Sequence, residues 1–343
     1  MASGSDALTM GSSAGSAGTP FPPAPLARAT RRGIESGLGL SEQAMLFEKG
    51  LSALVREIVG RWASIRILRH DSWVADGPAL FLVEDRARKS ILHLSPAAFP
   101  DDVAHGCEKA RAFRARFGLE HASPMLLPLH EGRYAHRSYA ILPYRVPHSE
   151  FPLIGRLQRG RIRPSLLDWL AGLASQLDTQ AELEHRLRAY RANLNALAEL
   201  TDGVPRVRDA IGQALARLEG GAIEPQFVPM HGNLQAGNIL SGRHSDSCPF
   251  ALIDWRASET SGYPIFDLIR FAHSYRISTR RLRHQLDRHA HILGCTTDDT
   301  RIHLLAAIGH FAVHRGDLSI AGLVETATAC LTTHDAALHG ANS

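Results

Sequence analysis

The sequence lacks the patterns that define several protein classes. Its 343 residues include only four cysteines, and no two of them form a Cys-x-x-Cys pair. This spacing predicts buried thiols in a reducing compartment rather than a disulfide framework or a paired-cysteine zinc site. No apolar run approaches the ~20 residues that a membrane helix needs, and the first residues lack the basic and apolar segments of a secretory signal. We therefore expect a cytoplasmic protein with no membrane association.

Neither basic nor acidic residues are in large excess. The chain has 38 lysines and arginines against 34 aspartates and glutamates, which gives a net charge of +4. An excess this small predicts no nucleic-acid partner unless the basic residues form a concentrated patch. Hydrophobic residues make up 44% and charged residues 21% of the chain, which is typical of a folded soluble protein. The length predicts two domains or one two-lobed unit.

Composition and periodicity divide the chain into four parts. Residues 1–40 begin with a Gly-, Ser-, Ala- and Pro-rich segment that has almost no charge, and this part is predicted to be a disordered tail. Residues 41–145 combine strand-length apolar runs with helical patterns, whereas residues 146–335 have mainly helical patterns. Residues 336–343 are predicted to be a flexible end. The predicted fold class is therefore α+β, with a mixed β first lobe and a mainly helical second lobe.

The individual elements are predicted from hydrophobic spacing. In the first lobe, helical spacing predicts a helix from Ser41 and a helix over Asp102–Phe117. Short apolar runs between turn residues predict the strands Ala79–Val83, Ser90–Leu94 and Tyr139–Leu142. The second lobe is predicted to contain helices over Leu166–Leu177, Ala181–Leu200 and Val204–Leu218, two short strands between Phe227 and Trp255, and further helices to about Thr333.

Polar residues with possible chemical roles are concentrated in one stretch of the second lobe. It reads His231-Gly-Asn-Leu-Gln-Ala-Gly-Asn238-Ile-Leu, followed by Phe250-Ala-Leu-Ile-Asp254-Trp. The apolar residues on either side predict that His231 to Asn238 form a loop and that Asp254 ends the next strand. Asn238 and Asp254 would then face one point. A carboxylate and an amide oxygen suit Mg²⁺, which leaves its other coordination positions to phosphates and water.

From Met230 to Leu268 the sequence resembles the aminoglycoside phosphotransferase and choline kinase family, whose fold is similar to that of the protein kinases. The family's catalytic loop reads approximately His-Gly-Asp-Leu-His-x-Gly-Asn-Ile-Leu, and its metal motif is Ile-Asp-Trp followed by Gly-Asp-Pro-x-x-Asp-Leu. The resemblance implies a two-lobed kinase-like fold that binds ATP and Mg²⁺. It also implies that Asn238 and Asp254 are the metal ligands, that His231 shapes the catalytic loop and that Asp267 braces the C-terminal lobe.

The first departure from the family pattern is at the catalytic aspartate, whose place is taken by Asn233. An amide cannot accept a proton from a substrate hydroxyl, and general-base assistance is typically worth ~10² to 10⁴ in rate. Phosphoryl transfer depends largely on positioning and electrostatic stabilisation, so Asn233 can still orient a hydroxyl group. An alternative is that Asn233 serves only as a turn residue. This departure predicts impaired activity.

The second departure is in the first lobe, where His93 takes the place of the ATP-binding lysine. The preferred alignment rests on Ser95-Pro96, which follow His93 as in the family pattern. Lys89 offers a rival alignment, but four strand residues span ~13 Å, so both cannot occupy one site. Glu108 matches the acidic residue that pairs with the family's lysine. The loop that would cover the nucleotide has a single glycine, Gly77, and this supports close phosphate approach poorly.

Two functions are predicted. The first is ATP- and Mg²⁺-dependent phosphoryl transfer to a hydroxyl of a small molecule, with impaired turnover, and the second is a pseudokinase that binds a nucleotide or ligand in a regulatory role. Six arginines and one acidic residue lie between Arg270 and His291 (Arg270, Arg276, Arg280, Arg281, Arg283, Arg288 and Asp287). This excess favours a neutral or anionic acceptor over a polycationic one, unless the arginines form a solvated helix face away from the cleft.

Overall fold

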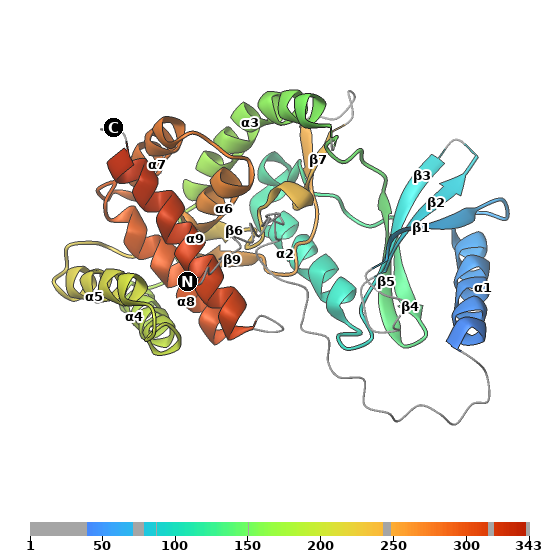
Figure 1. The fold of residues 1–343 in the computed structure, drawn as a ribbon, viewed down its shortest axis with the longest axis horizontal. Coiled ribbons are helices and arrows are strands. Elements are labelled where there is room, and N and C mark those ends of the chain that lie inside the picture. The colour runs from blue at the N-terminus through green and yellow to red at the C-terminus, as the bar shows by residue number, and fades with distance from the viewer. Residues whose placement is uncertain are drawn as a thin grey trace, which may run out of the picture.

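The computed structural model describes residues 40–70, 79–86, 88–149, 151–242, 248–314 and 319–340. Residues 1–39 of the predicted tail and Gly77 of the predicted nucleotide-covering loop lie outside the described residues. The described residues form a sheet-containing lobe and a mainly helical lobe (Figure 1). The predicted two-lobed α+β fold class is therefore confirmed.

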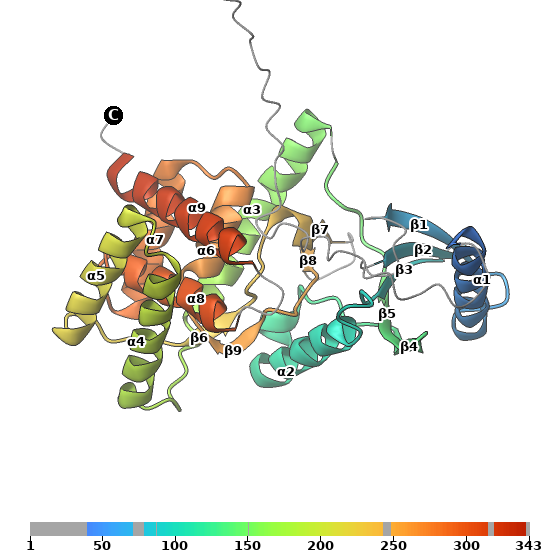
Figure 2. The ribbon, with the colours of Figure 1, turned by 60° about the horizontal axis from the view of Figure 1, so that its bottom comes forward.

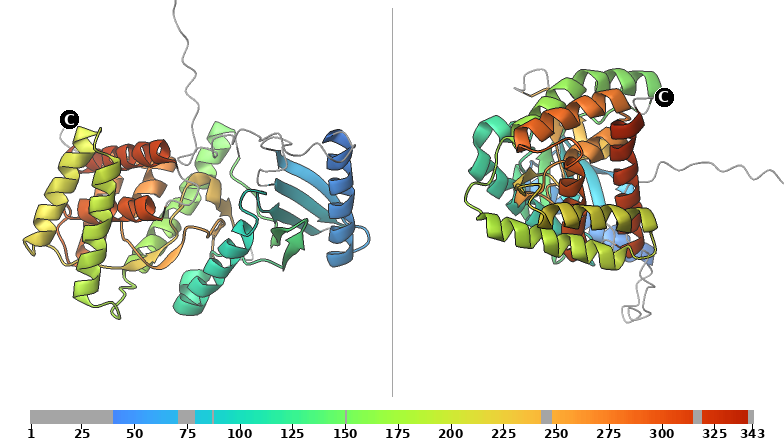
Figure 3. Two further views of the ribbon diagram at one scale, coloured as in Figure 1. Left: turned by 90° about the horizontal axis from the view of Figure 1, so that it is seen from below. Right: turned by 90° about the vertical axis from the view of Figure 1, so that its left-hand side faces the viewer.

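The first lobe is a five-stranded antiparallel sheet with a helix on one face. Its strands have the order β1-β2-β3-β5-β4, and their bounds are β1 Ser64–His70, β2 Ala79–Asp85, β3 Arg88–Leu94, β4 His130–Tyr134 and β5 Arg137–Pro143. Helix α1, Leu40–Ile58, buries Leu51 and Val55 against Phe81, Leu92 and Ile141. It covers the face that is turned away from the helical lobe (Figure 3). Because side chains alternate along a strand, His93 lies on the opposite face from Leu92.

Helix α2, Asp102–Ala122, connects the two lobes. Near its start Val103 and Cys107 pack on Ala140 of β5, whereas Phe113 stacks on Trp255 of the helical lobe with ring centroids 4.9 Å apart. Gly118 interrupts the helix with a positive φ of 66°, a conformation that glycine adopts without strain. The helix therefore belongs to the packing of both lobes (Figure 2).

The second lobe contains seven α-helices and four short strands among the described residues. Its elements are α3 Pro152–Ala174, α4 Leu183–Leu200, α5 Pro205–Glu219, β6 Val228–Met230, the 3₁₀ helix Ala236–Asn238, β7 Ile239–Ser241, β8 Phe250–Leu252, β9 Glu259–Gly262, α6 Phe266–Ser274, α7 Thr279–Leu293, α8 Thr300–Val313 and α9 Ile320–His339. The strands pair as β6-β9 and β7-β8. Both pairs flank the predicted polar loop.

Helix α8 forms the centre of this lobe. Every residue from Ile302 to Gly309 is buried, so the helix is covered on all sides, as expected for a core helix. It contacts α4 closely, because a Cβ added at Gly309 would lie 2.1 Å from the backbone oxygen of Asn193. This core supports α6 and the loop before it.

The observed elements extend the predicted ones at several ends. Helix α3 begins at Pro152 rather than Leu166, and α9 continues to His339. Strands β4 and β9 were not predicted. None of the helices in the described part of the chain is both long enough and apolar enough to span a membrane.

Candidate active site

A buried carboxylate binds the backbone of the loop between β6 and β7. Asp267, in the first turn of α6, accepts hydrogen bonds from the backbone N–H groups of His231 (2.6 Å) and Gly232 (3.0 Å). Burial raises the pKa of Asp267 to about 6, although both hydrogen bonds oppose this rise. Gly232 has φ of 77°, and an added Cβ would lie 2.2 Å from the backbone oxygen of Ala257. Only glycine fits this turn.

His231 connects the loop to the strand that precedes Asp254. The backbone N–H of Asn233 donates to His231 Nδ1 (3.2 Å), so Nδ1 carries no proton and Nε2–H donates to the backbone oxygen of Ile253 (3.1 Å). Burial lowers the pKa of His231 to about 4, which keeps the ring neutral at pH 7. The geometry agrees with the loop-shaping role that the resemblance implies, although that role stays a prediction.

The side chains of Asn233, Asn238 and Asp254 meet at one point. Asn233 Nδ2 donates to Asp254 Oδ2 at 2.6 Å, and Asn238 Nδ2 lies 3.4 Å from the same oxygen. Asn238 Nδ2 also donates to the backbone oxygen of Asn233 at 2.9 Å. Asp254 has φ of 65°, so the chain turns sharply after β8. Asn233 Oδ1 is buried and has no hydrogen-bond partner among the described residues.

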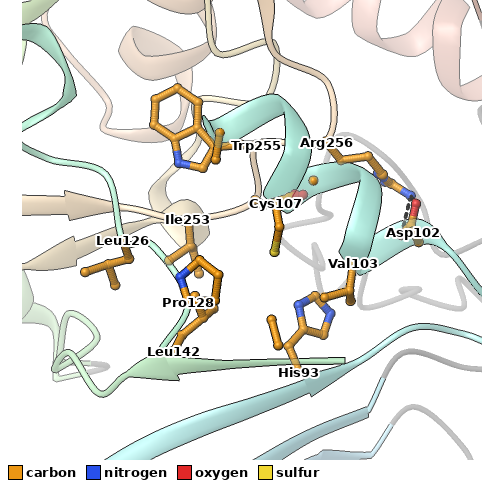
Figure 4. Close-up of a pocket in the computed structure, with 14 residues that line it drawn as sticks. His93, Asp102, Val103, Cys107, Leu126, Pro128, Leu142, Ile253, Trp255 and Arg256 are labelled. Atoms are coloured by element: carbon orange, nitrogen blue, oxygen red, sulfur yellow. Dashed lines mark hydrogen bonds and ion pairs between the residues drawn. The ribbon is translucent and has the colours of Figure 1, made fainter. Parts of the chain in front are cut away.

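A cavity of about 60 Å³ lies next to this point, between the two lobes (Figure 4). Its walls come from α2, β3, β5 and the segment from Ile253 to Arg256. Apolar side chains such as Val103, Leu142 and Ile253 form most of the wall, and His93, Asp102, Asp254 and Arg256 supply the polar groups. An apolar cleft with a few convergent polar groups is the usual form of a small-molecule site.

His93 extends from β3 into the cavity toward Val103 (Figure 4). Burial lowers its pKa, and the carboxylates of Asp254 and Asp102 oppose this only in part. His93 therefore does not provide the positive charge of a lysine at pH 7. Lys89 lies at the far end of β3, where its Nζ forms an ion pair with Glu84 of β2 at 2.9 Å. Of the two alignments, the structure places His93 and not Lys89 in the cavity.

Glu108 is not brought to His93. On α2 the buried face is formed by Val103, Cys107 and Ala110, whereas Glu108 is exposed and does not line the cavity. One helical residue corresponds to a rotation of about 100°, so the residue next to Cys107 faces solvent. The match of Glu108 to the acidic residue of the family's ion pair is therefore corrected, because Glu108 does not face His93.

The sequence prediction missed an ion pair between the lobes in this cavity. Arg256 Nη1 lies 3.1 Å from Asp102 Oδ1 and 3.0 Å from Asp102 Oδ2. Arg256 follows the Ile-Asp-Trp motif directly, and Asp102 begins α2. The available signals were an arginine beside the metal motif and an acidic residue in the first turn of a helix, but neither indicated its partner 154 residues away.

No protein-family model matches the chain, and neither does any curated protein. Among solved structures, it is similar to the aminoglycoside phosphotransferase APH(4)-Ia, with a TM-score of 0.51, 15% identity, and coverage of 84% of this chain and 98% of that chain. It is also similar to a thermostable mutant of APH(4)-Ia in ternary complex with AMP-PNP and hygromycin B, with a TM-score of 0.52, 14% identity, and coverage of 86% and 100%.

The chain has the aminoglycoside phosphotransferase fold. The fold expected from the loop motif is thereby confirmed across most of the chain. In this fold the loop that begins at His231, the residue Asp254 and the interlobe cavity lie together. The roles of Asn233, His231, His93, Asn238 and Asp254 stay predictions.

Proposed function

We propose that this protein is an ATP- and Mg²⁺-dependent phosphotransferase that acts slowly on a hydroxyl group of a small molecule. The observation that carries this proposal is the convergence of Asn233, Asn238 and Asp254 beside the interlobe cavity. The similar APH(4)-Ia mutant structure contains AMP-PNP, which supports a nucleotide in the equivalent cleft.

The donor set at this point fits Mg²⁺. Asp254 supplies a carboxylate, and Asn238 lies beside it. The amide of Asn238 presents its nitrogen to Asp254, and rotation about its terminal bond would present the oxygen instead. Two protein ligands are sufficient for Mg²⁺, because phosphates and water complete its octahedron. A bound Mg²⁺ would neutralise charge on the transferring phosphate.

Arg256 is proposed to supply the cation that His93 does not. Its guanidinium group lies in the same cavity as His93 and carries its charge at all physiological pH values. Asp102 fixes its position through the two contacts described above, as an acidic residue fixes the lysine in the kinase pattern. In this arrangement the ion pair is retained, but its positive partner comes from the helical lobe.

Asn233 is proposed to orient the acceptor. Its Nδ2 is fixed on Asp254, which leaves the buried Oδ1 as the remaining hydrogen-bonding group. An acceptor hydroxyl can donate to this oxygen and thereby direct its own oxygen at the phosphoryl group. The amide cannot take the proton, so turnover should be reduced by the ~10² to 10⁴ that a general base contributes.

A second candidate function, a pseudokinase, is favoured by the bond from Asn233 to Asp254. This bond satisfies one carboxylate oxygen without a metal, so the loop is complete in the absence of a nucleotide. A protein of this kind would bind MgATP and produce no ADP. The cytoplasmic location expected from the sequence stays a prediction under either function.

The test is calorimetric titration of MgATP into the full chain, combined with a measurement of ADP formation. We expect binding that requires Mg²⁺ and disappears in Asp254→Asn, which keeps the shape of the side chain and removes its charge. Asp202→Asn is the matched control, because the Asp202 side chain is 82% exposed. Equal binding by the wild-type protein and Asp254→Asn would contradict the proposed function. Binding without ADP formation would favour the pseudokinase.

A further inference from the structure

Three arginines lie on one face of α3 beside the candidate active site. Arg156, Arg159 and Arg163 are spaced by three and four residues, which places their side chains on the same side of a helix. Arg281 of α7 approaches this face. Burial lowers the pKa of the Arg163 guanidinium, and the positive charges of Arg281, Arg156 and Arg159 lower it further. The four positive groups therefore repel one another.

No carboxylate compensates this charge within the part of the chain that the structure describes. None of the four arginines forms an ion pair there, whereas Arg283 and Arg288 of α7 pair with acidic residues. The sequence from Phe151 to Leu167 contains four arginines and no acidic residue. A cluster of like charges is destabilising without a counter-charge. The cluster is thus suited to an external anion.

Polar groups next to these arginines also lack partners. Nε of Arg163 and Nδ1 of His148 are buried and form no hydrogen bond among the described residues. The other ring nitrogen of His148 lies 2.8 Å from the hydroxyl group of Tyr275. Buried polar atoms are nearly always paired in folded proteins. One unpaired nitrogen thus belongs to the cluster and the other lies on a neighbouring side chain, and both could bind an external anion.

The cluster lies next to the loop that contains Asn233. Tyr275 directly follows Ser274, and Ser274 Oγ accepts a hydrogen bond from the backbone N–H of Ala236 at 3.1 Å. On the other side of the loop, the backbone N–H of Ser241 donates to the oxygen of Val146 at 3.0 Å. A small molecule bound at Asn233 can therefore extend toward the arginines.

We infer that Arg159, Arg163 and Arg281 form a subsite for an anionic group on the acceptor. The substrate class would be an alcohol that also carries a carboxylate or a phosphate, since both present oxygens that a guanidinium group binds in pairs. The assignment of the anionic group to an acceptor rests on the proposed phosphotransferase function, whereas anion binding by the arginines does not. Arg159 and Arg163 are half-buried, whereas Arg281 and Arg156 are exposed, and Arg156 adds to the positive potential.

The test compares glycerol 3-phosphate with glycerol, because these probes share their carbon skeleton and differ in charge. Thermal unfolding of the full chain is measured with each probe at matched ionic strength. We expect glycerol 3-phosphate to raise the melting temperature of the wild-type protein by about 2–4 °C at concentrations well above its dissociation constant. Glycerol should cause no shift.

The decisive variant is Arg159→Gln combined with Arg281→Gln, with Arg191→Gln on the exposed face of α4 as the matched control. The double variant should lose the response to glycerol 3-phosphate, whereas Arg191→Gln should keep it. Without a probe, the melting temperature of the double variant should be at least that of the wild-type protein, because the substitutions remove repulsion between the arginines. An equal response of the wild-type protein and the double variant would overturn the inference.

Titration of MgATP into the wild-type protein separates this inference from the proposed function. If MgATP binds and the anion response is the same in all variants, the subsite is wrong and the proposed function stands. If MgATP does not bind but the response depends on Arg159 and Arg281, the anion site stands and the proposed function is wrong.

Discussion

The side-chain amide of Asn233 donates a hydrogen bond to the carboxylate of Asp254, with 2.6 Å between Asn233 Nδ2 and Asp254 Oδ2. This bond joins the residue at the family's catalytic position to the residue expected to hold the metal. The other atom of the amide, Oδ1, is buried and has no hydrogen-bond partner among the described residues. The same contact explains why an amide is accommodated here, because two carboxylates at this distance would repel each other without a metal.

The variant Asn233→Asp tests this relationship directly. The new carboxylate can accept a proton, so we expect ADP formation to rise by about 10²-fold or more at saturating MgATP. Without Mg²⁺, repulsion from Asp254 should lower the melting temperature of the variant. The comparison variant Asn233→Ala removes the orienting oxygen and should reduce the residual rate further. Turnover that stays at the wild-type level in Asn233→Asp, despite MgATP binding, would contradict a catalytic cleft.

Substitution of Arg256 tests the source of the phosphate-binding charge. Hydrogen bonds to charged groups are worth about 1.5–3 kcal/mol, so Arg256→Met should weaken MgATP binding by about 10-fold or more. Asp102→Asn should weaken it less, because the arginine keeps its charge and loses only its fixed position. Arg208→Met, in an exposed ion pair with Asp202, is the control. If His93→Ala weakens binding and Arg256→Met does not, the phosphate contact belongs to His93.

The parts of the molecule that could be predicted from the sequence are those that depend on local pattern. The loop from His231 to Asn238 and its position beside Asp254 follow from a dense motif between short strands. Strand β4 was missed because its residues, His-Glu-Gly-Arg-Tyr, are mostly polar and lie at the edge of the sheet. Strand β9, Glu-Thr-Ser-Gly, likewise lacks an apolar run and is held by backbone pairing with β6.

The parts that could not be predicted depend on contacts between distant segments. Helical periodicity places Cys107 on the apolar face of α2, and Cys107 is buried, whereas Glu108, which was matched through the resemblance, is exposed. The pair of Arg256 and Asp102 joins residues whose proximity follows only from the packing of the two lobes. The meeting of Arg163 with Arg281 likewise depends on the contact between α3 and α7.

A pair of glycine substitutions tests the packing at the centre of the helical lobe. Gly309→Ala should destabilise the protein by about 1–3 kcal/mol through overpacking, because the new methyl group would meet the backbone of Asn193 at 2.1 Å. Gly212→Ala on α5 has open space around it and should be stabilising by up to about 1 kcal/mol through helix propensity. Urea unfolding measures both changes. Equal effects would show that α4 and α8 are not in close contact.

Stability should fall in mild acid because of buried histidines such as His303. The hydroxyl group of Tyr190 donates to the backbone oxygen of Gln226, so it accepts from His303 Nδ1–H at 2.8 Å, and His303 Nε2 is buried without a partner in the described part of the chain. Burial lowers the pKa of His303 from 6.5 to about 4. The unfolded chain therefore binds more protons between these values.

The stabilising effect of neutral His303 is fully present above pH 6.5 and is lost as the pH falls toward 4. Between pH 7 and pH 5 this one residue should account for about 2 kcal/mol of the decrease in unfolding free energy. His303→Asn keeps a hydrogen-bond donor for Tyr190 but should lower the unfolding free energy at pH 7. Between pH 7 and pH 5, its unfolding free energy should fall by about 2 kcal/mol less than that of the wild-type protein. Urea unfolding at both pH values measures the difference, and identical slopes would contradict the assignment.

Helix α2 has a mechanical consequence for the cleft. Its later turns are fastened to the helical lobe by Phe113 against Trp255, by Lys109 with Glu259 at 2.8 Å and by Arg116 with Asp178 at 3.1 Å. Its start is fastened to the sheet lobe, because the backbone N–H groups of Val103 and Ala104 donate to the hydroxyl groups of Ser95 (2.9 Å) and Ser138 (3.1 Å). If the lobes move apart, Arg256 should keep its distance from Asp254, and His93 should travel with the sheet. Because α2 is fastened at both ends, opening of the cleft must strain or break contacts at one of them.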